Sequence, residues 1–407
     1  MMPAGGGRRN RQIELVLPAH YEPRSQVPAP YFPDMPPRHT RPVAVVFGTR
    51  PEAIKLAPVI LRLRERGVPP LVVITGQHRE LVDDVLDRFE IGIDQDLDLM
   101  LPKQSLDHVL SHSLEGIGRI LDEHQPAAVV VQGDTTSTLG ASLAAFHRHV
   151  PVAHVEAGLR SRSLDFPYPE EMNRRVVSMV ARWHFAPTVR SADNLRAEGV
   201  DAGVHVTGNT VVDALDILNR KSLELPGRLV QFLDRQRFIL ATGHRRESWG
   251  GGIRNVAGAL SEVLRAEPDL RLVFVTHPNP EARRPVTETL GEEPRACIVD
   301  ALDYPGFIGL MRRAELVVSD SGGVQEEGPT LGIPILVTRG VTERPEGVDA
   351  GAVRLVGTDR EAVRAATLDL LRNADLRQRM SEAGRGLYGD GRAAERIAQV
   401  LIDEVWS

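Results

Sequence analysis

The segment "PVAVVFG" at residues 42–48, followed by "PEAIKLAPVILRLRERG" at residues 51–67, decides the fold class. The first stretch is a continuous apolar run, which is typical of a strand buried on both faces of a parallel sheet. The second has a helical pattern, and Pro51 is well suited to the first position of a helix. A buried strand followed at once by a helix is the repeating unit of an α/β sheet.

The same unit recurs along the chain and starts afresh after residue 208. We therefore predict an α/β protein with two Rossmann-like domains that face each other across a cleft. The expected parts are a flexible Pro-, Gly- and Arg-rich extension (1–40), an N-terminal domain (41–207), a C-terminal domain (208–388) and a final helix that packs back on the N-terminal domain (389–407). The predicted strands are 42–48, 70–76, 127–134, 150–158, 237–245, 270–278, 314–323 and 333–340.

Composition excludes several classes of protein. The chain has 407 residues, 42% of them hydrophobic and 26% charged, which indicates a globular protein with more than one core. A net charge of −6 provides no field that would draw nucleic acid or an anionic membrane. No apolar run approaches the roughly 20 residues that span a bilayer. A single cysteine, Cys297, excludes a disulfide framework, so we expect a cytoplasmic protein that binds no metal.

Polar side chains gather where the predicted strands end. Ligands of open parallel sheets bind at the carboxyl ends of the strands. Their common position therefore predicts one active site between the two domains. The strand-end groups are Thr49-Arg50, Gly133-Asp134, His154-Glu156, His244-Arg246, His277 and Asp320-Ser321.

The motif "SDSGGVQEEGPTLG" at residues 319–332 follows a strand and opens a helix. Backbone N–H groups of Ser321, Gly322 and Gly323 would form a site for a diphosphate. The structural alternative is an ordinary turn with Ser and Gly as caps. Glu327 lies one turn on, where it could accept hydrogen bonds from both ribose hydroxyls, whereas Glu326 points elsewhere and is expected to be structural.

The motif "FGTRPEAIK" at residues 47–55 is the counterpart in the first domain. It lacks the glycine fingerprint of dinucleotide-binding proteins. Arg50 and Lys55 could each face a phosphate across the cleft, although Lys55 could also be a solvated helix charge. Only three of the 49 Lys and Arg residues are lysines, so a lysine can mark a place that needs a compact ammonium.

Further candidates for acid–base chemistry follow other strands. Asp134 could be catalytic or a helix N-cap. Glu156 ends a buried strand and needs a cationic partner, which Arg160 could supply. His244 also stands at a strand end, where a structural role is the alternative.

Two adjacent glutamates, Glu170 and Glu171, stand in "PYPEEMNRR" at residues 167–175. Adjacent residues on a helix point about 100° apart, so the pair cannot share one task. Both could simply stabilise the positive end of a helix dipole.

Together these motifs resemble the non-hydrolysing UDP-N-acetylglucosamine 2-epimerases over about residues 42–405. The resemblance implies a glycosyltransferase-B fold, interconversion of UDP-GlcNAc and UDP-ManNAc without a cofactor, and a homodimer. It rests on "FGTRPEAIKLAP", "GDTTSTLGASLAAF", "HVEAGLRS", "PYPEEMNRR", "FAPT", "TGNTVVDAL", "TGHRRES", "SDSGGVQEEGPTLG" and "TERPEGVDAGAVRLVGTD".

The resemblance also assigns roles to residues. It makes Glu170 the working member of its pair and Glu171 a structural partner. The catalytic residues that it implies are Asp134, Glu156, Glu170 and His244. Those that bind the UDP-sugar are Arg50, Lys55, His277, Phe307, Ser321, Gly322, Gly323 and Glu327. Those associated with a second, activating UDP-GlcNAc are Gln77, His78 and Arg79.

The expected reaction expels UDP to give a 2-acetamidoglucal and then adds UDP back. The sequence departs from the family at Arg162 and Asp165, in the loop on the sugar side, which leaves the exact UDP-sugar open. The rival functions are a hydrolysing relative, an epimerase for a modified UDP-acetamido sugar, a glycosyltransferase and a non-catalytic UDP-sugar sensor. The complete acid–base set argues against the sensor, and the lack of a basic-apolar patch argues against a membrane glycosyltransferase.

Overall fold

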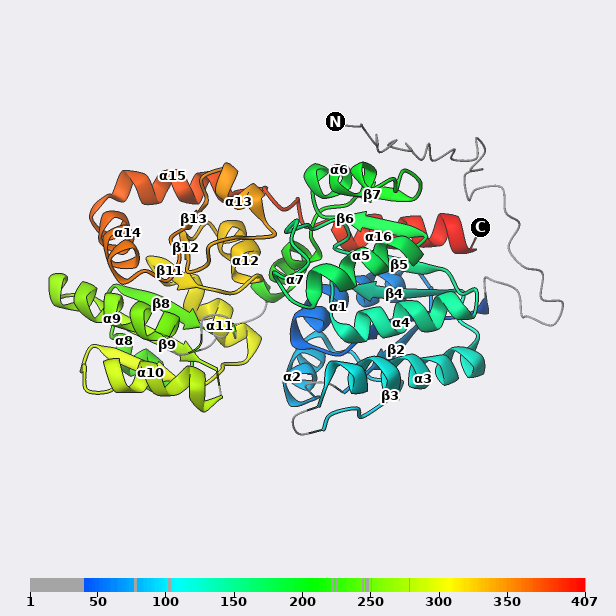
Figure 1. The fold of residues 1–407 in the computed structure, drawn as a ribbon, viewed down its shortest axis with the longest axis horizontal. Helices are drawn as coiled ribbons and strands as arrows, with labels where there is room; N and C mark the ends of the chain where they lie inside the picture. Colours follow the sequence, from blue (N-terminus) through cyan, green and yellow to red (C-terminus); the bar gives the residue numbers. More distant parts are fainter. Residues whose placement is uncertain are drawn as a thin grey trace, which may run out of the picture. The chain divides into compact units, whose positions relative to one another are not determined.

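The computed structural model describes residues 40–406 apart from residues 77–78, 102–103, 221–222, 224, 244, 246–248, 250 and 278. All the described residues belong to one compact unit, which contains two parallel sheets. Strands and helices alternate along the chain, as the sequence predicts (Figure 1).

The N-terminal half is built on a seven-stranded sheet in the order β3-β2-β1-β4-β5-β6-β7. Every neighbouring pair of its strands is parallel. Its elements are β1 (Val43–Phe47), α1 (Arg50–Glu65), β2 (Pro70–Ile74), α2 (Arg79–Phe89), β3 (Gln95–Asp96), α3 (Leu106–His124), β4 (Ala128–Gln132), α4 (Thr136–His147), β5 (Val152–Val155), α5 (Glu170–Val180), β6 (Trp183–Ala186), α6 (Val189–Ala197), β7 (Val204–Val206) and α7 (Thr210–Asn219).

The C-terminal half repeats the plan with a six-stranded parallel sheet in the order β10-β9-β8-β11-β12-β13. Both orders reverse direction next to the first strand, as in Rossmann sheets. Its elements are α8 (Gly227–Leu233), β8 (Phe238–Gly243), α9 (Gly251–Ala266), β9 (Arg271–Thr276), α10 (Pro280–Leu290), β10 (Ala296–Val299), α11 (Tyr304–Met311), β11 (Leu316–Ser319), α12 (Val324–Thr330), β12 (Ile335–Val337), α13 (Pro345–Asp349), β13 (Val353–Leu355), α14 (Arg360–Arg372), α15 (Ala374–Gly384) and α16 (Ala393–Leu401), with a π-helical turn (Ile402–Trp406).

Alternate residues of each strand enter different cores, because side chains of a strand point to opposite faces. In β1, Val43, Val45 and Phe47 pack with α1, whereas Ala44 and Val46 pack with α3 and α4. Each sheet is therefore buried on both faces, which explains the unbroken apolar runs in the sequence. This confirms the predicted α/β class.

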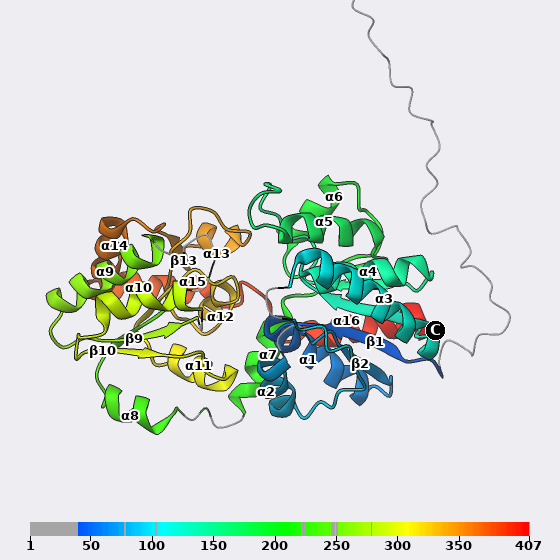
Figure 2. The ribbon, with the colours of Figure 1, turned by 60° about the horizontal axis from the view of Figure 1, so that its bottom comes forward.

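Helix α7 links the two halves, because it packs against both α1 and α12. The chain then returns, and α16 lies beside α1 and α7 (Figure 2). The domain boundaries expected at residues 208 and 389 stay predictions, since α7 contacts elements on both sides. Among the helices that the structure describes, none combines the length and apolar character needed to span a bilayer.

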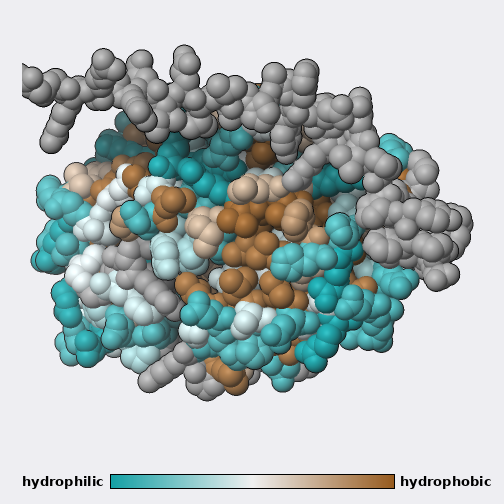
Figure 3. All heavy atoms as spheres, turned by 45° about the vertical axis from the view of Figure 1, so that its right-hand side comes forward, coloured by the Kyte–Doolittle hydropathy of each residue, from teal (hydrophilic) through white to brown (hydrophobic). Residues whose placement is uncertain are grey.

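One face of the N-terminal half carries exposed apolar side chains, and Figure 3 shows a broad apolar area on the face that it displays. Phe146 on α4 and Met179 on α5 are 48% and 69% exposed. The two helices pack side by side.

The turn after β5 requires glycine at residue 158, and this gives a test of the fold. Gly158 has a φ of +88°, and a Cβ there would lie 2.1 Å from the carbonyl oxygen of Ser191. We expect Gly158→Ala to lower the free energy of unfolding by about 3 kcal/mol or more, measured by urea unfolding. Gly67→Ala is the matched control, because Gly67 has a φ of +77° but no atom within 4 Å of an added Cβ. It should cost only about 1–2 kcal/mol of backbone strain, and equal losses would contradict the close packing at residue 158.

Candidate active site

Buried carboxylate Glu52 fixes the loops that follow β1 and β4. Its Oε2 accepts hydrogen bonds from the backbone N–H groups of Gly48 (2.9 Å) and Thr49 (2.7 Å). Its Oε1 accepts from the hydroxyls of Thr135 and Thr138, both at 2.7 Å. The Ser/Thr-rich start of α4 thus ties two strand ends together, next to Asp134.

Lys55 and Glu156 form a buried ion pair within the N-terminal half. Lys55 lies in the second turn of α1 and is 5% exposed, and its Nζ contacts Glu156 Oε2. Glu156 directly follows β5 with a φ of +65°, a conformation that is strained for a residue with a Cβ. Such strain persists where the surrounding structure fixes the residue, and it is concentrated at functional sites.

Two residues of the C-terminal half complete this cluster. Glu326 Oε2 lies 2.7 Å from Lys55 Nζ, and Glu326 Oε1 accepts from Arg344 Nε at 2.5 Å. Arg344 Nη2 lies 3.5 Å from Glu156 Oε1. The four side chains form a closed ring of two cations and two carboxylates, with no net charge.

The ring changes the protonation of its members. Burial raises the pKa of Glu156, and the charge of Glu326 raises it further, while Lys55 and Arg344 oppose both effects. Burial would also raise the pKa of Glu326, but Arg344 and Lys55 outweigh burial and lower it. Burial acts to lower the pKa of Lys55, and the two carboxylates more than offset it. Glu156 therefore takes up a proton more readily than Glu326.

Glu156 does not pair with Arg160, the partner that the sequence suggests. Arg160 donates instead to Glu198, with Nη2 2.7 Å from Oε2. The chain folds Lys55 and Arg344 onto Glu156 from distant segments, so the nearest arginine in sequence is not the partner.

Asp134 and Glu171 are joined through Arg174. Arg174 donates from Nε to Asp134 Oδ2 at 3.0 Å and from Nη1 to Glu171 Oε2 at 2.8 Å. Glu171 is fully buried and also accepts from the backbone N–H of Ser161 at 3.0 Å and from Arg175 Nε at 3.2 Å. Its hydrogen bonds give Glu171 a structural role, in holding the loop after β5 and the guanidinium beside Asp134.

Glu170 has a different environment. It is the first residue of α5, and Pro169 is the N-cap of this helix. Burial raises the pKa of Glu170, and the nearby charge of Asp134 adds to this effect. Within the described part of the chain, its buried Oε2 has no hydrogen-bond partner. Glu170 is thus a partly desolvated carboxyl with free hydrogen-bonding capacity.

Glu327 on α12 and Arg50 on α1 lie near each other, since the charge of each acts on the pKa of the other. Tyr304 donates its hydroxyl hydrogen to Glu327 Oε1 at 3.0 Å. Burial raises the pKa of Glu327 to about 7, although the Tyr304 hydrogen bond opposes the rise. Arg50 donates to the carbonyl oxygen of Leu302 at 3.0 Å, and Phe307 lies one turn after Tyr304 on α11.

Residues 321–323 form the turn between β11 and α12. Ser321 N–H donates to Ser319 Oγ at 3.0 Å, and Gly323 is the N-cap of α12. A Cβ on Gly322 would lie 2.9 Å from Arg344 Nη1. Glycine therefore lets the turn approach the charged ring closely.

The remaining predicted residues either have other contacts or lie outside the described residues. His277 follows β9, where its Nδ1 accepts from Asn279 N–H at 3.0 Å and its ring lies tilted at 47° to that of Trp249, with the centroids 5.9 Å apart. His244, Gln77 and His78 lie outside the described residues, as does the side chain of Arg79. Their catalytic and activating roles stay predictions.

Arg245, the residue after His244, contacts two acidic residues of the C-terminal half. Arg245 N–H donates to Asp320 Oδ2 at 3.0 Å, and its Nη2 lies 4.0 Å from Glu343 Oε1. The charge of Arg245 also acts on Glu170, lowering its pKa against the effect of burial. Arg245 therefore brings a positive charge from the C-terminal half toward the N-terminal carboxyls.

Sequence reasoning missed several residues of this site. They are Glu52, Arg174, Arg245, Tyr304, Glu343 and Arg344. The available signal was a charged Glu-Arg pair inside "TERPEG", because charges in a segment that folds into a core must be paired. Which charges they pair with depends on the tertiary structure.

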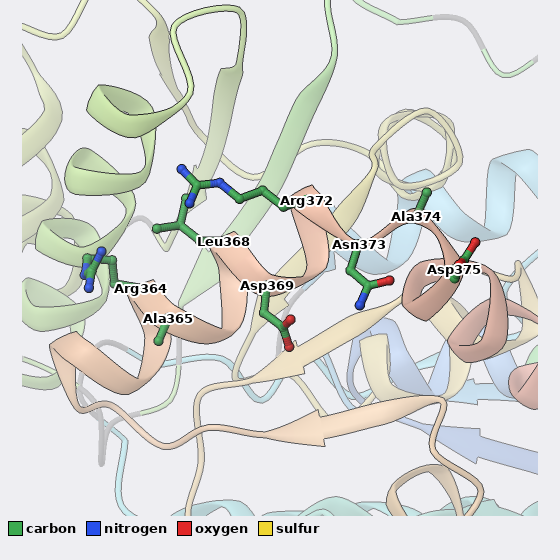
Figure 4. Close-up of a pocket in the computed structure, with 8 residues that line it drawn as sticks. All are labelled: Arg364, Ala365, Leu368, Asp369, Arg372, Asn373, Ala374 and Asp375. Carbon is green, nitrogen blue, oxygen red and sulfur yellow. The ribbon is translucent and has the colours of Figure 1, made fainter.

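A separate hollow lies on the C-terminal half, away from the charged residues described above. It lies along α14 and the start of α15 (Figure 4), with Arg364, Asp369 and Arg372 among its lining residues. Its open, charged lining is typical of a surface hollow. Among the described residues, no group of three or more His, Cys, Asp or Glu side chains is placed to hold a metal ion.

Comparison with known proteins identifies the family. Residues 62–402 match the family model described as UDP-N-acetylglucosamine 2-epimerase. The chain belongs to this family. It is 45% identical to the UDP-N-acetylglucosamine 2-epimerase of Yersinia pestis, over 88% of this chain and 98% of the relative. The corresponding protein of Escherichia coli strain K12 is 44% identical over the same shares.

Solved structures of the epimerase family share the fold. The Neisseria meningitidis UDP-GlcNAc 2-epimerase bound to UDP-GlcNAc has a TM-score of 0.84 and 41% identity, over 89% of this chain and 100% of that one. The Staphylococcus aureus MnaA–UDP structure has a TM-score of 0.85 and 39% identity, over 89% and 96%. MurG of Acinetobacter baumannii, at 14% identity and a TM-score of 0.56, is similar in fold alone. The glycosyltransferase-B fold that the sequence predicts is therefore confirmed.

The unequal environments of Glu170 and Glu171 give a stability test. Glu171→Gln should lower the free energy of unfolding by about 1–3 kcal/mol, because it removes the charge of one of the two carboxylates that pair with buried Arg174 and weakens the acceptor of the Ser161 N–H. Glu170→Gln should change it by less than about 0.5 kcal/mol, since Oε2 of Glu170 has no partner to lose within the described chain. Denaturant unfolding of both variants measures the difference. Equal losses would contradict the anchoring role of Glu171.

Proposed function

We propose that this chain interconverts UDP-GlcNAc and UDP-ManNAc by inverting C2 of the sugar, as a non-hydrolysing UDP-GlcNAc 2-epimerase. The family match over residues 62–402 carries the proposal. It is supported by relatives solved with UDP-GlcNAc or UDP bound, among them the Neisseria and Methanocaldococcus jannaschii enzymes. The N-terminal half has carboxyl groups that can transfer protons. Basic residues from both halves lie close to them and can stabilise negative charge.

The proposed mechanism begins by breaking the bond between C1 and the UDP oxygen. The proton on C2 is not acidic, because no carbonyl flanks that carbon, so loss of UDP has to come first. Positive charge then develops at C1 and the ring oxygen, where nearby carboxylates stabilise it. Removal of the C2 proton forms the C1=C2 double bond of 2-acetamidoglucal. Adding a proton to the opposite face of C2, and UDP to C1, gives the epimer.

We assign the proton transfers to the carboxyls and His244. Glu170 fits this role because its raised pKa brings it closer to the working pH and its Oε2 is free to bind substrate. Asp134 lies close enough to act on the pKa of Glu170 and is held by Arg174. Glu156 is the other carboxyl of the N-terminal half to which we assign proton exchange with the sugar. The turn at Ser321–Gly323, with Arg50 and Glu327, would hold the UDP so that it can add back.

Incubation of the purified protein with UDP-GlcNAc in deuterated water, followed by NMR, tests the activity. We expect UDP-ManNAc to appear, with deuterium at C2 of the sugar, because the proton is exchanged during each turnover. Free ManNAc formed in step with UDP would favour a hydrolysing enzyme instead. Bound nucleotide without exchange at C2 would favour a sensor and contradict the proposal.

Glutamine variants test the acid–base assignment. Glu170→Gln should lower kcat by roughly 100-fold or more, the usual scale for loss of a general acid or base, while UDP binding stays near that of the wild type. Glu171→Gln is the control and should keep most of its kcat. A larger loss of kcat in the Glu171 variant would overturn the assignment.

The pKa of Glu327 predicts how UDP binding depends on pH. An ionised carboxylate can accept hydrogen bonds from both ribose hydroxyls, one on each oxygen, whereas protonation turns one oxygen into a donor and so removes this paired acceptance. With a pKa of about 7, Glu327 should lose this ability as the pH falls from 8 to 6. We expect the Kd for UDP, measured by calorimetry, to rise over that range in the wild type. The rise should be absent in Glu327→Gln, and a rise of the same size in that variant would exclude Glu327 as its cause.

We also propose that the chain forms a homodimer through α3, α4 and α5. These adjacent helices expose Leu106, Phe146, Met172 and Met179. Leu143 and Val176 lie partly buried beside them. An apolar surface of this kind on a globular protein marks an interaction site, and a second copy is the partner that the family resemblance implies.

Light scattering after size-exclusion chromatography tests the dimer. We expect the wild type at twice the chain mass, and Met179→Glu shifted toward the monomer because a charge would be buried at the interface. Val230→Glu is the control, since Val230 is 53% exposed on α8 in the other half. A monomeric wild type, or equal behaviour of the two variants, would contradict this interface.

A further inference from the structure

Glu326 is the least exposed member of the charged ring, at 1% exposure. Its two carboxylate oxygens contact two different cations, Lys55 from one half of the chain and Arg344 from its own half. A buried carboxylate of this kind is costly unless it is fully paired. Both of its oxygens have a cation beside them only if both halves contribute.

The ring closes through two contacts that cross between the halves. One joins Lys55 Nζ to Glu326 Oε2 at 2.7 Å, and the other joins Arg344 Nη2 to Glu156 Oε1 at 3.5 Å. Arg344 has a further partner within its own half, because its Nη1 donates to Glu343 Oε1 at 2.5 Å. Glu326 thus lies where it can orient both cations that reach Glu156.

We propose that Glu326 is a positioning residue for the epimerase reaction: it holds Lys55 and Arg344 against Glu156, and it balances their charge so that Glu156 is not fixed as a permanently ionised partner. The inference rests on the proposed function only in giving Glu156 a task at the sugar. Glu326 itself need not touch the substrate.

The balance of charges around Glu156 supports this role. The charged or titratable groups that act on it are Lys55 on α1, Glu326 on α12, Arg344 before α13 and Tyr388, and Asn209 Nδ2 lies 3.5 Å from its Oε2. With Glu326 present, two cations face two carboxylates. Without its charge, two cations would face Glu156 alone and strongly favour its ionised form. The pKa of Glu156 would therefore fall.

The pH dependence of kcat in Glu326→Gln tests the proposal. In the profile of kcat against pH, one limb reports the titration of Glu156, and we expect this limb to move to lower pH by about one unit or more. The loss of kcat should exceed any change in KM. Glu326→Asp keeps the charge, so its limb should stay near that of the wild type even if kcat falls. An unmoved limb in Glu326→Gln, or equal shifts in both variants, would overturn the proposal.

Glu52→Gln is the control for loss of a buried glutamate. Glu52 is also nearly inaccessible, but its hydrogen bonds come from backbone N–H groups and hydroxyls. This variant is expected to lose stability without a shift of the Glu156 limb. A shift as large as that in Glu326→Gln would mean that disturbed packing, rather than charge, moves the limb.

A double-mutant cycle makes the test independent of activity. Lys55→Met, Glu326→Gln and the double variant are compared by thermal unfolding of the ligand-free protein. We expect the double variant to unfold at a higher temperature than the sum of the single losses predicts, because each single change leaves a buried charge unpaired. Additive losses would contradict the ring itself. Absence of epimerisation by the wild type, with coupling intact, would refute the proposed function while leaving the ring in place.

Discussion

A single ammonium group, Nζ of Lys55, links the two halves of this protein chemically. It is buried between Glu156, at the end of a strand in the first sheet, and Glu326, near the start of a helix in the second. A buried cation is strongly destabilising without a partner, and one carboxylate at each side satisfies it. The compact ammonium suits a place where two carboxylates approach from different directions, whereas the planar guanidinium of Arg344 spans the same pair from the side.

Around this ring, the acidic residues divide into two kinds. Glu52 and Glu171 accept hydrogen bonds from backbone N–H groups and thereby fix the loops after β1 and β5, and Asp320 accepts from the backbone N–H of Arg245. Glu170 and Glu327 lie nearby with raised pKa values and fewer bonds. The first kind holds the site rigid, and the second kind can exchange a proton or bind a ligand. Two adjacent glutamates in α5 can belong to different kinds because the helix turns them about 100° apart.

An elimination and re-addition reaction needs both kinds of acidic residue. The departing UDP has to be retained until it adds back, so the nucleotide side needs fixed contacts, while the sugar side needs carboxyls that can gain and lose protons. The proposed UDP-binding residues lie mostly in the C-terminal half, and the proposed acid–base carboxyls lie in the N-terminal half. The charged ring joins the two halves, so it can link nucleotide binding in the C-terminal half to the protonation of Glu156 in the N-terminal half.

The sequence alone determined the alternation of buried strands and helices, and hence the parallel α/β class, because apolar runs and helix starts are local features. It also placed the polar groups at strand ends, and the motifs placed the chain in its family. It could not pair Glu156 with Lys55 and Arg344, 101 and 188 residues away, and it favoured Arg160 instead. It separated Glu327 from a structural Glu326, but it could not show that Glu326 pairs with Lys55 and Arg344, or that Glu171 anchors Arg174. Ion pairs between distant segments depend on how the two sheets come together, and only the tertiary structure fixes which charges share a buried space.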